Sequence, residues 1–353
     1  MLEFLNAFGF NSNETQIEIY GSGLINSTWL LTHKKEQYIL QKINQSVFKQ
    51  PELIAENIKN LYEYIKQTQP HYLFVNTLPT TDGKHLLKLN STDYYRLFPF
   101  IKNSITHQNV ITTQIAFEAA KAFGNFTKMF LDFNTHKLNI TIPNFHNILL
   151  RYEQFNNAIS NASIERKIKS TYEINFLKSQ ERIVHEFEGI VNNSNFKLRV
   201  THHDTKISNV LFNKADKGLC VIDLDTIMPG YFISDVGDMM RTYLSAANEE
   251  EKDFDKIIVR DEYFKAIADG YLSEMQHELT TDELNHFFYA GEFLIYMQAL
   301  RFLTDYLNND VYYGAKYAEH NFIRACNQIN LLQKYQTKKE IFIEYINSII
   351  DHS

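Results

Sequence analysis

The stretch from Thr201 to Phe212 reads THHDTKISNVLF and places two histidines, an aspartate, a lysine and an asparagine in one short segment. The apolar run LRV precedes it and VLF closes it, and both runs are typical of buried strands. A polar segment this dense between buried strands has three simple interpretations: a surface turn, a metal site or a catalytic loop. The spacing of its polar residues distinguishes them.

Four residues separate Asp204 from Asn209, and a further apolar run, Leu219 to Ile222, ends in Asp223 and Asp225. In phosphoryl transfer, one aspartate accepts or orients the proton of the attacking hydroxyl, an asparagine holds magnesium, and a later aspartate holds magnesium against the nucleotide phosphates. Carboxylates and a carboxamide suit Mg²⁺ because this ion prefers hard oxygen donors. The order and spacing therefore favour a phosphoryl-transfer site.

Two other interpretations compete with this one. Asp and Asn are common in ordinary turns, where they hydrogen-bond the local backbone. A zinc site at His202, His203 and Asp204 is the sharper alternative, but adjacent side chains on an extended chain point to opposite faces and suit a single metal poorly. A preceding strand-rich segment, with a glycine turn and a strand lysine, favours the phosphoryl-transfer interpretation over both.

Composition narrows the function classes. The chain has 353 residues, 44% of them hydrophobic, which is enough to form two domain cores. Its net charge of −7, with scattered lysines, gives no basic surface for nucleic acid. No basic segment followed by a long apolar stretch opens the chain, and Cys220 and Cys326 stand far apart. We therefore expect a cytoplasmic protein, a monomer or weak dimer, that acts on small molecules and binds neither nucleic acid nor membrane.

The first hundred residues predict a small lobe of strands with one helix. Pro51 suits a helix start, and apolar residues then recur at helical spacing. The expected strands are residues 16–22, 27–33, 37–44, 71–79, 85–89 and 94–101, with the helix over 51–67.

After Ile101 the pattern becomes mainly helical. We expect helices over residues 112–133, 170–192, 263–275 and 280–307, the last opened by a capping box of Thr280 with Glu283. The sequence therefore predicts an α+β fold, with one lobe over residues 1–101 and a helical lobe over 102–353.

These motifs resemble the aminoglycoside phosphotransferase and choline kinase superfamily, whose fold is similar to that of protein kinases. The resemblance runs through YILQKINQSVF, ENI, THHDTKISNVL, VIDLDTIMPGYFISDVGDMMR and RFLTDYL…DVYY…HNFIRACNQ, and is strongest to the N-acetylhexosamine 1-kinases. It implies a two-lobed fold with a small antiparallel-sheet N-lobe and a mainly helical C-lobe. It also implies ATP as phosphoryl donor, Mg²⁺, and the anomeric hydroxyl of N-acetylglucosamine or N-acetylgalactosamine as acceptor.

Residue by residue, the resemblance implies that Asp204 is the catalytic base and contacts the acceptor. It makes Asn209 and Asp223 magnesium ligands, with IDLD in place of the protein kinase DFG, and Asp225 a second ligand or a substrate contact. Three further residues are expected to be structural: Asp235 and Asp238 as braces of the catalytic loop, and His203 beside the base.

The nucleotide side rests on weaker patterns. Gly21 and Gly23 lie in a hairpin turn whose backbone amides could approach phosphates, although Asn26 stands where a kinase has its third glycine. Gln41 and Lys42 point to opposite faces of a strand, and Lys42 is chemically the better phosphate ligand.

The helix that follows offers Glu56 as the partner of this lysine, with Glu52 as its rival. Near the lobe crossing, Phe98, Phe100 or Ile101 would supply a backbone N–H to adenine, since proline has none.

For the acceptor, Arg301 with Tyr313 forms a reasonable sugar-binding cluster. The alternative for the arginine is an i,i+4 pair with Asp305, and His146 is expected to be a packed histidine. Other functions remain open at this point: a kinase for choline, methylthioribose, homoserine or an aminoglycoside, or a nucleotide-binding module without catalysis.

Overall fold

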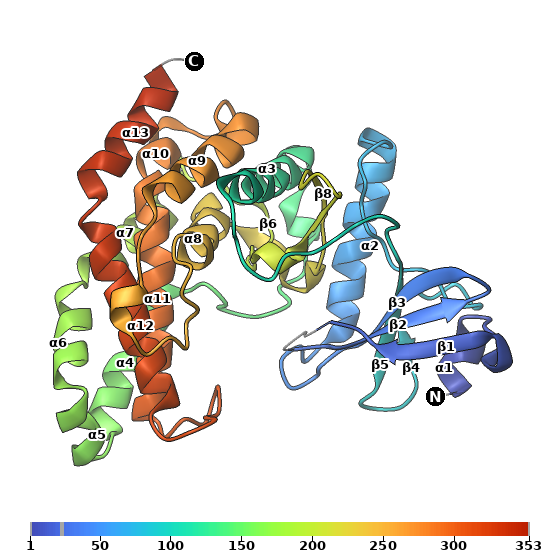
Figure 1. Cartoon of the computed structure of the whole chain (residues 1–353), viewed down its shortest axis with the longest axis horizontal. Helices are drawn as coiled ribbons and strands as arrows, with labels where there is room; N and C mark the ends of the chain where they lie inside the picture. Colours follow the sequence, from blue (N-terminus) through green and yellow to red (C-terminus); the bar gives the residue numbers. More distant parts are fainter. Residues whose placement is uncertain (1, 22–24, 352–353) are drawn as a thin grey trace.

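The computed structural model, described here over residues 2–21 and 25–351, contains a small sheet lobe and a larger, mainly helical lobe (Figure 1). The sheet lobe contains α1 (Leu2–Ala7), β1 (Thr15–Ile19), β2 (Ser27–His33), β3 (Glu36–Lys42), α2 (Pro51–Thr68), β4 (Leu87–Lys88) and β5 (Tyr94–Pro99). Its strands form one antiparallel sheet in the order β1-β2-β3-β5-β4. Figure 1 shows α2 standing between this sheet and the helical lobe, which confirms the expected α+β class.

The helical lobe begins with α3 (Thr113–Met129), α4 (Ile148–Asn161), α5 (Ile164–Lys169), α6 (Thr171–Ser179) and α7 (Arg182–Asn192). Two short antiparallel pairs follow, β6 (Arg199–Thr201) with β9 (Met228–Gly230) and β7 (Val210–Phe212) with β8 (Gly218–Val221). The lobe ends with α8 (Phe232–Tyr243), α9 (Asp261–Met275), α10 (Thr281–Asn285), α11 (Phe287–Leu307), α12 (His320–Gln336) and α13 (Lys339–Asp351). The motif of the opening stretch thus lies on the short strands, between the two groups of helices.

The two faces of the sheet differ in what they contact. Leu31, Leu40 and Leu97 pack with α1 into a small core of their own. Side chains alternate along a strand, so Lys42 lies on the same face as Leu40 and Gln41 on the opposite one. That opposite face carries the residues that reach the helical lobe.

Helix α11 forms the centre of the helical lobe and is buried along most of its length. It lies so close to α8 that a Cβ atom at Gly237 would stand 2.2 Å from the carbonyl oxygen of Ala290. Only glycine allows this approach, which brings α8 against the middle of the lobe. No helix in the described part of the chain has the length and apolar character needed to cross a membrane.

Several predicted elements differ from the structure. Residues 71–79 form no strand, because β4 pairs with Tyr94 and Tyr95 of β5 and leaves only a single bridge at Leu78. The helix expected over 170–192 is divided at Gln180, since α6 packs on α12 while α7 packs on α11. Helices α1, α4, α5, α8, α12 and α13 were not expected, and the helix expected over 280–307 is divided at His286 into α10 and α11.

The predicted capping box is confirmed. The hydroxyl of Thr280 accepts from the Glu283 N–H at 3.1 Å, and the Thr280 N–H donates to the Glu283 carboxylate at 2.9 Å.

Candidate active site

The catalytic loop between β6 and β7 is held by two carboxylates of α8. Asp235 accepts from the backbone N–H groups of His202 and His203 at 3.0 and 2.7 Å. Asp238 accepts from the N–H of Thr205 at 2.8 Å. Both acids therefore fix the backbone on either side of Asp204, in agreement with the bracing role expected from the sequence.

His203 has a left-handed backbone, with φ of 66°, directly before the candidate base. Non-glycine residues adopt this conformation rarely, and such strain concentrates at functional sites. Its ring Nδ1 lies 3.1 Å from the carbonyl oxygen of Thr201. The Nε2 of the His202 ring lies 2.9 Å from the carbonyl oxygen of Ile222. Burial lowers the pKa of His203 to about 4, so the ring is neutral at physiological pH.

Asp204 and Asn209 are joined within the loop. The side-chain amide of Asn209 donates to the backbone carbonyl of Asp204 at 2.9 Å, which leaves its amide oxygen for another partner. Lys206 lies 3.2 and 3.4 Å from the two carboxylate oxygens of Asp204. The sequence interpretation missed this lysine, although a cation two residues after the base was a visible signal.

Asp223 follows β8 with a left-handed backbone, φ 61°. The N–H of Ile222 donates to the Asn209 carbonyl at 2.9 Å, so the two candidate magnesium ligands lie on adjoining segments. Desolvation raises the pKa of Asp223 to about 7, and the carboxylates of Asp225 and Asp204 add to the rise. Water reaches the Asp223 side chain, and the neighbouring carboxylates of Asp225 and Asp204 raise its pKa even in this exposed position.

The oxygen donors of Asp223 and Asn209 fit a magnesium site. The described residues contain no group of three or more His, Cys, Asp or Glu placed to hold a metal. Mg²⁺ does not require one, because it commonly takes one or two carboxylates and completes its shell with water and substrate phosphates.

Asp225 forms a contact between the two lobes. Its carboxylate is buried, with one oxygen 2.5 Å from a guanidinium nitrogen of Arg96 and the other accepting from the Asn26 amide at 2.8 Å. Both oxygens are thus engaged by residues of the sheet lobe, which argues against the expected role as a magnesium ligand, and that role stays a prediction.

Arg96 was also missed by the sequence interpretation. It lies on β5 opposite Gln41 of β3, and the Gln41 side-chain oxygen accepts from its Nε and Nη2 at 3.0 and 2.8 Å. Gln41, Arg96, Asp225 and Asn26 thus form one network between the sheet and the loop that carries Asp223. An arginine in the middle of an otherwise apolar strand, YYRLFP, was the available signal.

The expected pair of Lys42 with Glu56 is not formed. Lys42 lies on the outer face of the sheet, 2.5 Å from Asp93, and Glu56 accepts from the Asn139 amide at 3.0 Å. The rival Glu52 accepts from the hydroxyl of Tyr94 at 2.6 Å. Strand alternation thus turns Gln41 toward the helical lobe, and the placement of Lys42 argues against phosphate binding.

The three candidate adenine donors differ in availability. The N–H of Phe100 donates to the Gln37 carbonyl at 3.2 Å, and Phe98 is paired with Ile39 in the sheet. Ile101 lies beyond this pairing, and its carbonyl accepts from Ser104.

At the glycine turn, Gly21 is exposed with φ of 73°, and a Cβ there would meet no atom within 4 Å. The prediction for Gly23 lies outside the described residues.

On the acceptor side, Arg301 stands over the rings of Tyr313 and Phe145 at 5.4 and 5.8 Å. It makes no ion pair with Asp305 in the described chain, since that carboxylate accepts from the N–H groups of Tyr312 and Tyr313 instead. The alternative of a helix-stabilising pair is therefore not what the structure shows.

His146 connects this side to the catalytic loop. Its ring stacks on that of Phe145 at 4.6 Å and meets the ring of His203 edge to face at 5.2 Å. Burial, followed by the nearby His203 and Arg301, keeps its pKa well below the usual value. A neutral, packed histidine therefore lies between the catalytic loop and Arg301.

An antiparallel-sheet lobe joined to a helical lobe, with a braced loop carrying Asp204 and Asn209 and with Asp223 beside it, defines a phosphotransferase of protein-kinase-like fold. A family model described as phosphotransferase enzyme family matches residues 16–276, and the chain belongs to that family. It is a small-molecule phosphotransferase.

Solved structures of several kinases share the fold. A microcompartment-associated aminopropanol kinase has a TM-score of 0.64 at 13% identity, over 96% of this chain and 97% of that one. An aminoglycoside phosphotransferase from Alicyclobacillus acidocaldarius has a TM-score of 0.62 at 12% identity, over 96% and 94%. A spectinomycin phosphotransferase solved with ADP and spectinomycin has a TM-score of 0.55 at 14% identity, over 98% and 95%. Together they confirm the expected two-lobed architecture.

Proposed function

We propose that the protein transfers the γ-phosphate of ATP, with Mg²⁺, to the anomeric hydroxyl of N-acetylglucosamine or N-acetylgalactosamine and forms the sugar 1-phosphate. The observation that carries the phosphoryl-transfer part is the braced loop that holds Asp204 and Asn209 next to Asp223. The proposed lobes are residues 1–101 for the nucleotide and 102–353 for catalysis and the acceptor.

In the proposed reaction, the carboxylate of Asp204 takes the proton of the acceptor hydroxyl as the acceptor oxygen bonds to the γ-phosphorus. The bond from that phosphorus to the bridging oxygen breaks, and ADP leaves. Lys206, beside both oxygens of Asp204, holds this carboxylate in place and adds positive charge near the transferred group. Asn209 and Asp223 would hold Mg²⁺, which neutralises charge on the nucleotide phosphates.

For the nucleotide, we propose Arg96 in the place first given to Lys42. Its guanidinium is buried on the inner face of the sheet, is fixed by Gln41 and Asp225, and lies close enough to Asp223 to offset part of the rise in the pKa of that carboxyl. Because its nitrogens are already engaged, we propose that Arg96 acts on the phosphates through its charge. Ile101 is the proposed backbone donor to adenine, and Gly21 and Gly23 are proposed to lie over the phosphates.

For the acceptor, the site offers neutral His146, Arg301 and Tyr313. Sugars fit such a surface, because aromatic rings pack on their apolar faces and polar groups bind their hydroxyls. A cationic acceptor such as choline would require nearby acidic side chains, whereas Arg301 is cationic and Asp305 is already engaged. The sugar kinase therefore remains the preferred proposal over kinases for choline, methylthioribose, homoserine or aminoglycosides, and over a non-catalytic nucleotide-binding module.

The experiment that tests this function is a panel of sugars and amino alcohols incubated with Mg-ATP, followed by phosphorus and carbon NMR of the product. We expect phosphorus coupled to C1 of an acetamido sugar. Phosphorus coupled to another carbon, or selective turnover of an amino alcohol, would overturn the anomeric assignment.

A further inference from the structure

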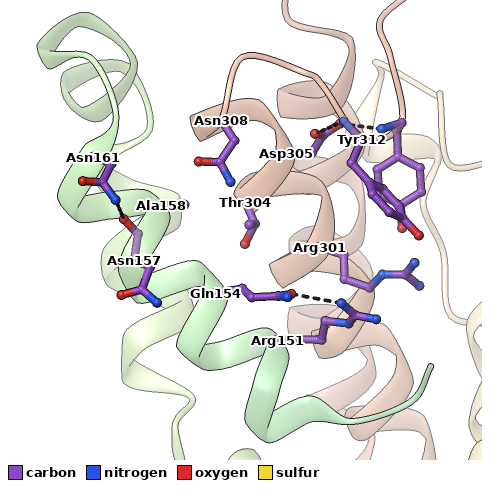
Figure 2. A pocket seen from close by; sticks show the side chains of 11 residues that line it. Arg151, Gln154, Asn157, Ala158, Asn161, Arg301, Thr304, Asp305, Asn308 and Tyr312 are labelled. Carbon is purple, nitrogen blue, oxygen red and sulfur yellow. Dashed lines mark hydrogen bonds between the residues drawn. The ribbon is translucent and has the colours of Figure 1, made fainter. Parts of the chain in front are cut away.

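A cavity of about 420 Å³ lies between α4 and α11 and is bounded on a third side by the segment that follows α11. We call it the arginine cavity, because Arg151 of α4 and Arg301 of α11 both line it. Figure 2 shows the two guanidinium groups at the same end of the cavity, with Thr304 and Tyr312 close by. Its volume falls in the range of small-molecule sites and has room for a substituted monosaccharide.

The two arginines have neutral partners only, among the described contacts. Arg151 donates to the side chain of Gln154 at 2.9 Å and to the carbonyl of Asn144 at 3.0 Å, while its Nε is buried without a partner. Arg301 donates to the side chain of Gln298 at 3.3 Å. Neither guanidinium is therefore neutralised by a carboxylate.

The cavity wall also contains one acidic residue, Asp305, but both of its carboxylate oxygens are already engaged in hydrogen bonds. Its two oxygens accept from the N–H groups of Tyr312 and Tyr313 at 2.7 and 2.9 Å, and one also accepts from the Asn321 amide at 3.0 Å. The remaining lining residues are uncharged. The excess of charge that faces the cavity is thus positive.

Two guanidinium groups held together in partial burial raise the free energy of the unliganded protein. Desolvation lowers the pKa of Arg151, and the charge of Arg301 lowers it further. A bound anion would remove this repulsion and could accept charge-assisted hydrogen bonds from both groups, including the unpartnered Nε. Arginine is especially suited to carboxylate and phosphate because its donors form a planar fork.

A series of ring contacts connects the cavity to the catalytic loop. The guanidinium of Arg301 stands 5.8 Å from the ring of Phe145, which stacks on His146, and His146 contacts His203 next to Asp204. Arg301 thus belongs both to the proposed acceptor site and to the cavity. A ligand group in the cavity would be part of the acceptor, beyond the hydroxyl that is phosphorylated.

We propose that the arginine cavity binds an anionic substituent of the acceptor, so that the preferred substrate is an acetamido sugar carrying a carboxylate or phosphate group. This inference rests on the proposed function, and it narrows the acceptor from neutral N-acetylhexosamines to their acidic derivatives. Arg151 is the residue that selects for charge, and Arg301 serves both neutral and acidic sugars.

The test compares N-acetylglucosamine with N-acetylmuramic acid and N-acetylglucosamine 6-phosphate as acceptors of the full-length enzyme. We expect the wild type to have at least a tenfold lower KM for one of the acidic sugars. Arg151→Gln should raise that KM about tenfold or more and change the KM for N-acetylglucosamine less than about twofold, because it removes only the charge-assisted hydrogen bond to the acidic group. Equal KM values for neutral and acidic sugars in the wild type would overturn the proposal.

Two controls separate charge recognition from folding. Arg151→Lys keeps the charge and should restore part of the preference, and Lys178→Gln removes a surface charge from α6 outside the cavity and should change neither KM. If Arg151→Gln raises both KM values equally, Arg151 has only a structural role and the proposal is wrong.

Binding measured by calorimetry without nucleotide distinguishes this inference from the proposed function. Heat from N-acetylmuramic acid that disappears in Arg151→Gln would support the cavity even if no sugar were phosphorylated. Absence of binding by both acidic sugars would overturn it even if N-acetylglucosamine were phosphorylated at C1.

Discussion

At the scale of single residues, the site separates groups that act on the substrate from groups that hold them in position. The Asp204 carboxylate is ion-paired with Lys206, whereas the carboxylates of Asp235 and Asp238 accept from backbone N–H groups of the loop. Sequence spacing predicts Asp204, Asn209 and Asp223 as the site, because these three residues lie close together in the chain as well as in the fold. It could not find Arg96, whose partner Asp225 is distant in sequence.

Asp204→Asn should lower kcat by about 10²- to 10⁴-fold, the range typical of a positioned general base. The asparagine is nearly isosteric and cannot accept the proton, while the loop braces and Asn209 are unchanged. Nucleotide affinity, measured by calorimetry with Mg-ADP, should stay within about threefold of the wild type, a shift of about 0.65 kcal/mol by the tenfold-per-1.4 kcal/mol relation. Near-normal turnover would remove Asp204 as the base.

Arg96 and Lys42 offer a direct comparison of the two faces of the sheet. Arg96→Met should raise the Kd for Mg-ATP at least about tenfold and also destabilise the protein by about 3–5 kcal/mol, since it leaves the buried carboxylate of Asp225 without its ion-pair partner. Lys42→Met should leave nucleotide affinity nearly unchanged, because Lys42 pairs with Asp93 on the outer face.

The double variant Arg96→Met with Asp225→Asn separates the two effects of Arg96. It removes the unpaired buried charge and should recover much of the stability, while the weak nucleotide binding persists. If nucleotide affinity returns together with stability, Arg96 acts only as the partner of Asp225.

At the scale of elements, local signals such as capping and periodicity located most helices and strands of the first lobe, but the contacts that divide or end these elements could not be predicted from them. The capping box of α10 followed from Thr280 and Glu283 alone, but the same Glu283 is fully buried in an ion pair with Arg199 of β6. Nothing near Glu283 in the sequence indicates that contact. The break between α6 and α7 has the same origin, since different helices of the lobe hold the two halves.

Gly237→Ala tests the close crossing of α8 and α11. The new Cβ would stand 2.2 Å from a backbone carbonyl that cannot move freely, so we expect a loss of about 3 kcal/mol or more in the free energy of unfolding, at or above the top of the usual overpacking range. Activity should fall as well, because α8 carries the acids that brace the catalytic loop.

Gly189→Ala is the matched control for this crossing. That glycine is exposed on α7 with no atom within 4 Å of the added Cβ, and alanine there should stabilise the protein by about 0.5–1 kcal/mol. Denaturant unfolding of both variants measures the difference. If Gly237→Ala leaves the free energy of unfolding unchanged, or changes it as Gly189→Ala does, α8 and α11 can move apart without loss of stability.

At the scale of the whole molecule, the two lobes meet through an apolar contact, in which α2 packs into the core of the helical lobe, and through several polar contacts. Arg96 and Asn26 reach Asp225 from the sheet lobe, and Asn57 of α2 donates to the carbonyl of Ile227. The change from strand-like to helical periodicity was enough to predict two lobes. Which strand face meets the helical lobe depends on register, and one residue of register decides between Gln41 and Lys42.

Because the proposed nucleotide site takes Arg96 from one lobe and Asp223 from the other, Mg-ADP should stabilise both lobes together. At a nucleotide concentration of 100 times Kd, linkage predicts about 2.7 kcal/mol of added stability. Hydrogen exchange should therefore slow in β3 and β5 as well as around residues 204–225. Addition of EDTA, or the change Asp223→Asn, should remove most of this protection. Asp216→Asn, in the nearby turn between β7 and β8, should retain it. Protection confined to the helical lobe would show that the nucleotide does not bridge the lobes and would return Arg96 to a purely structural role.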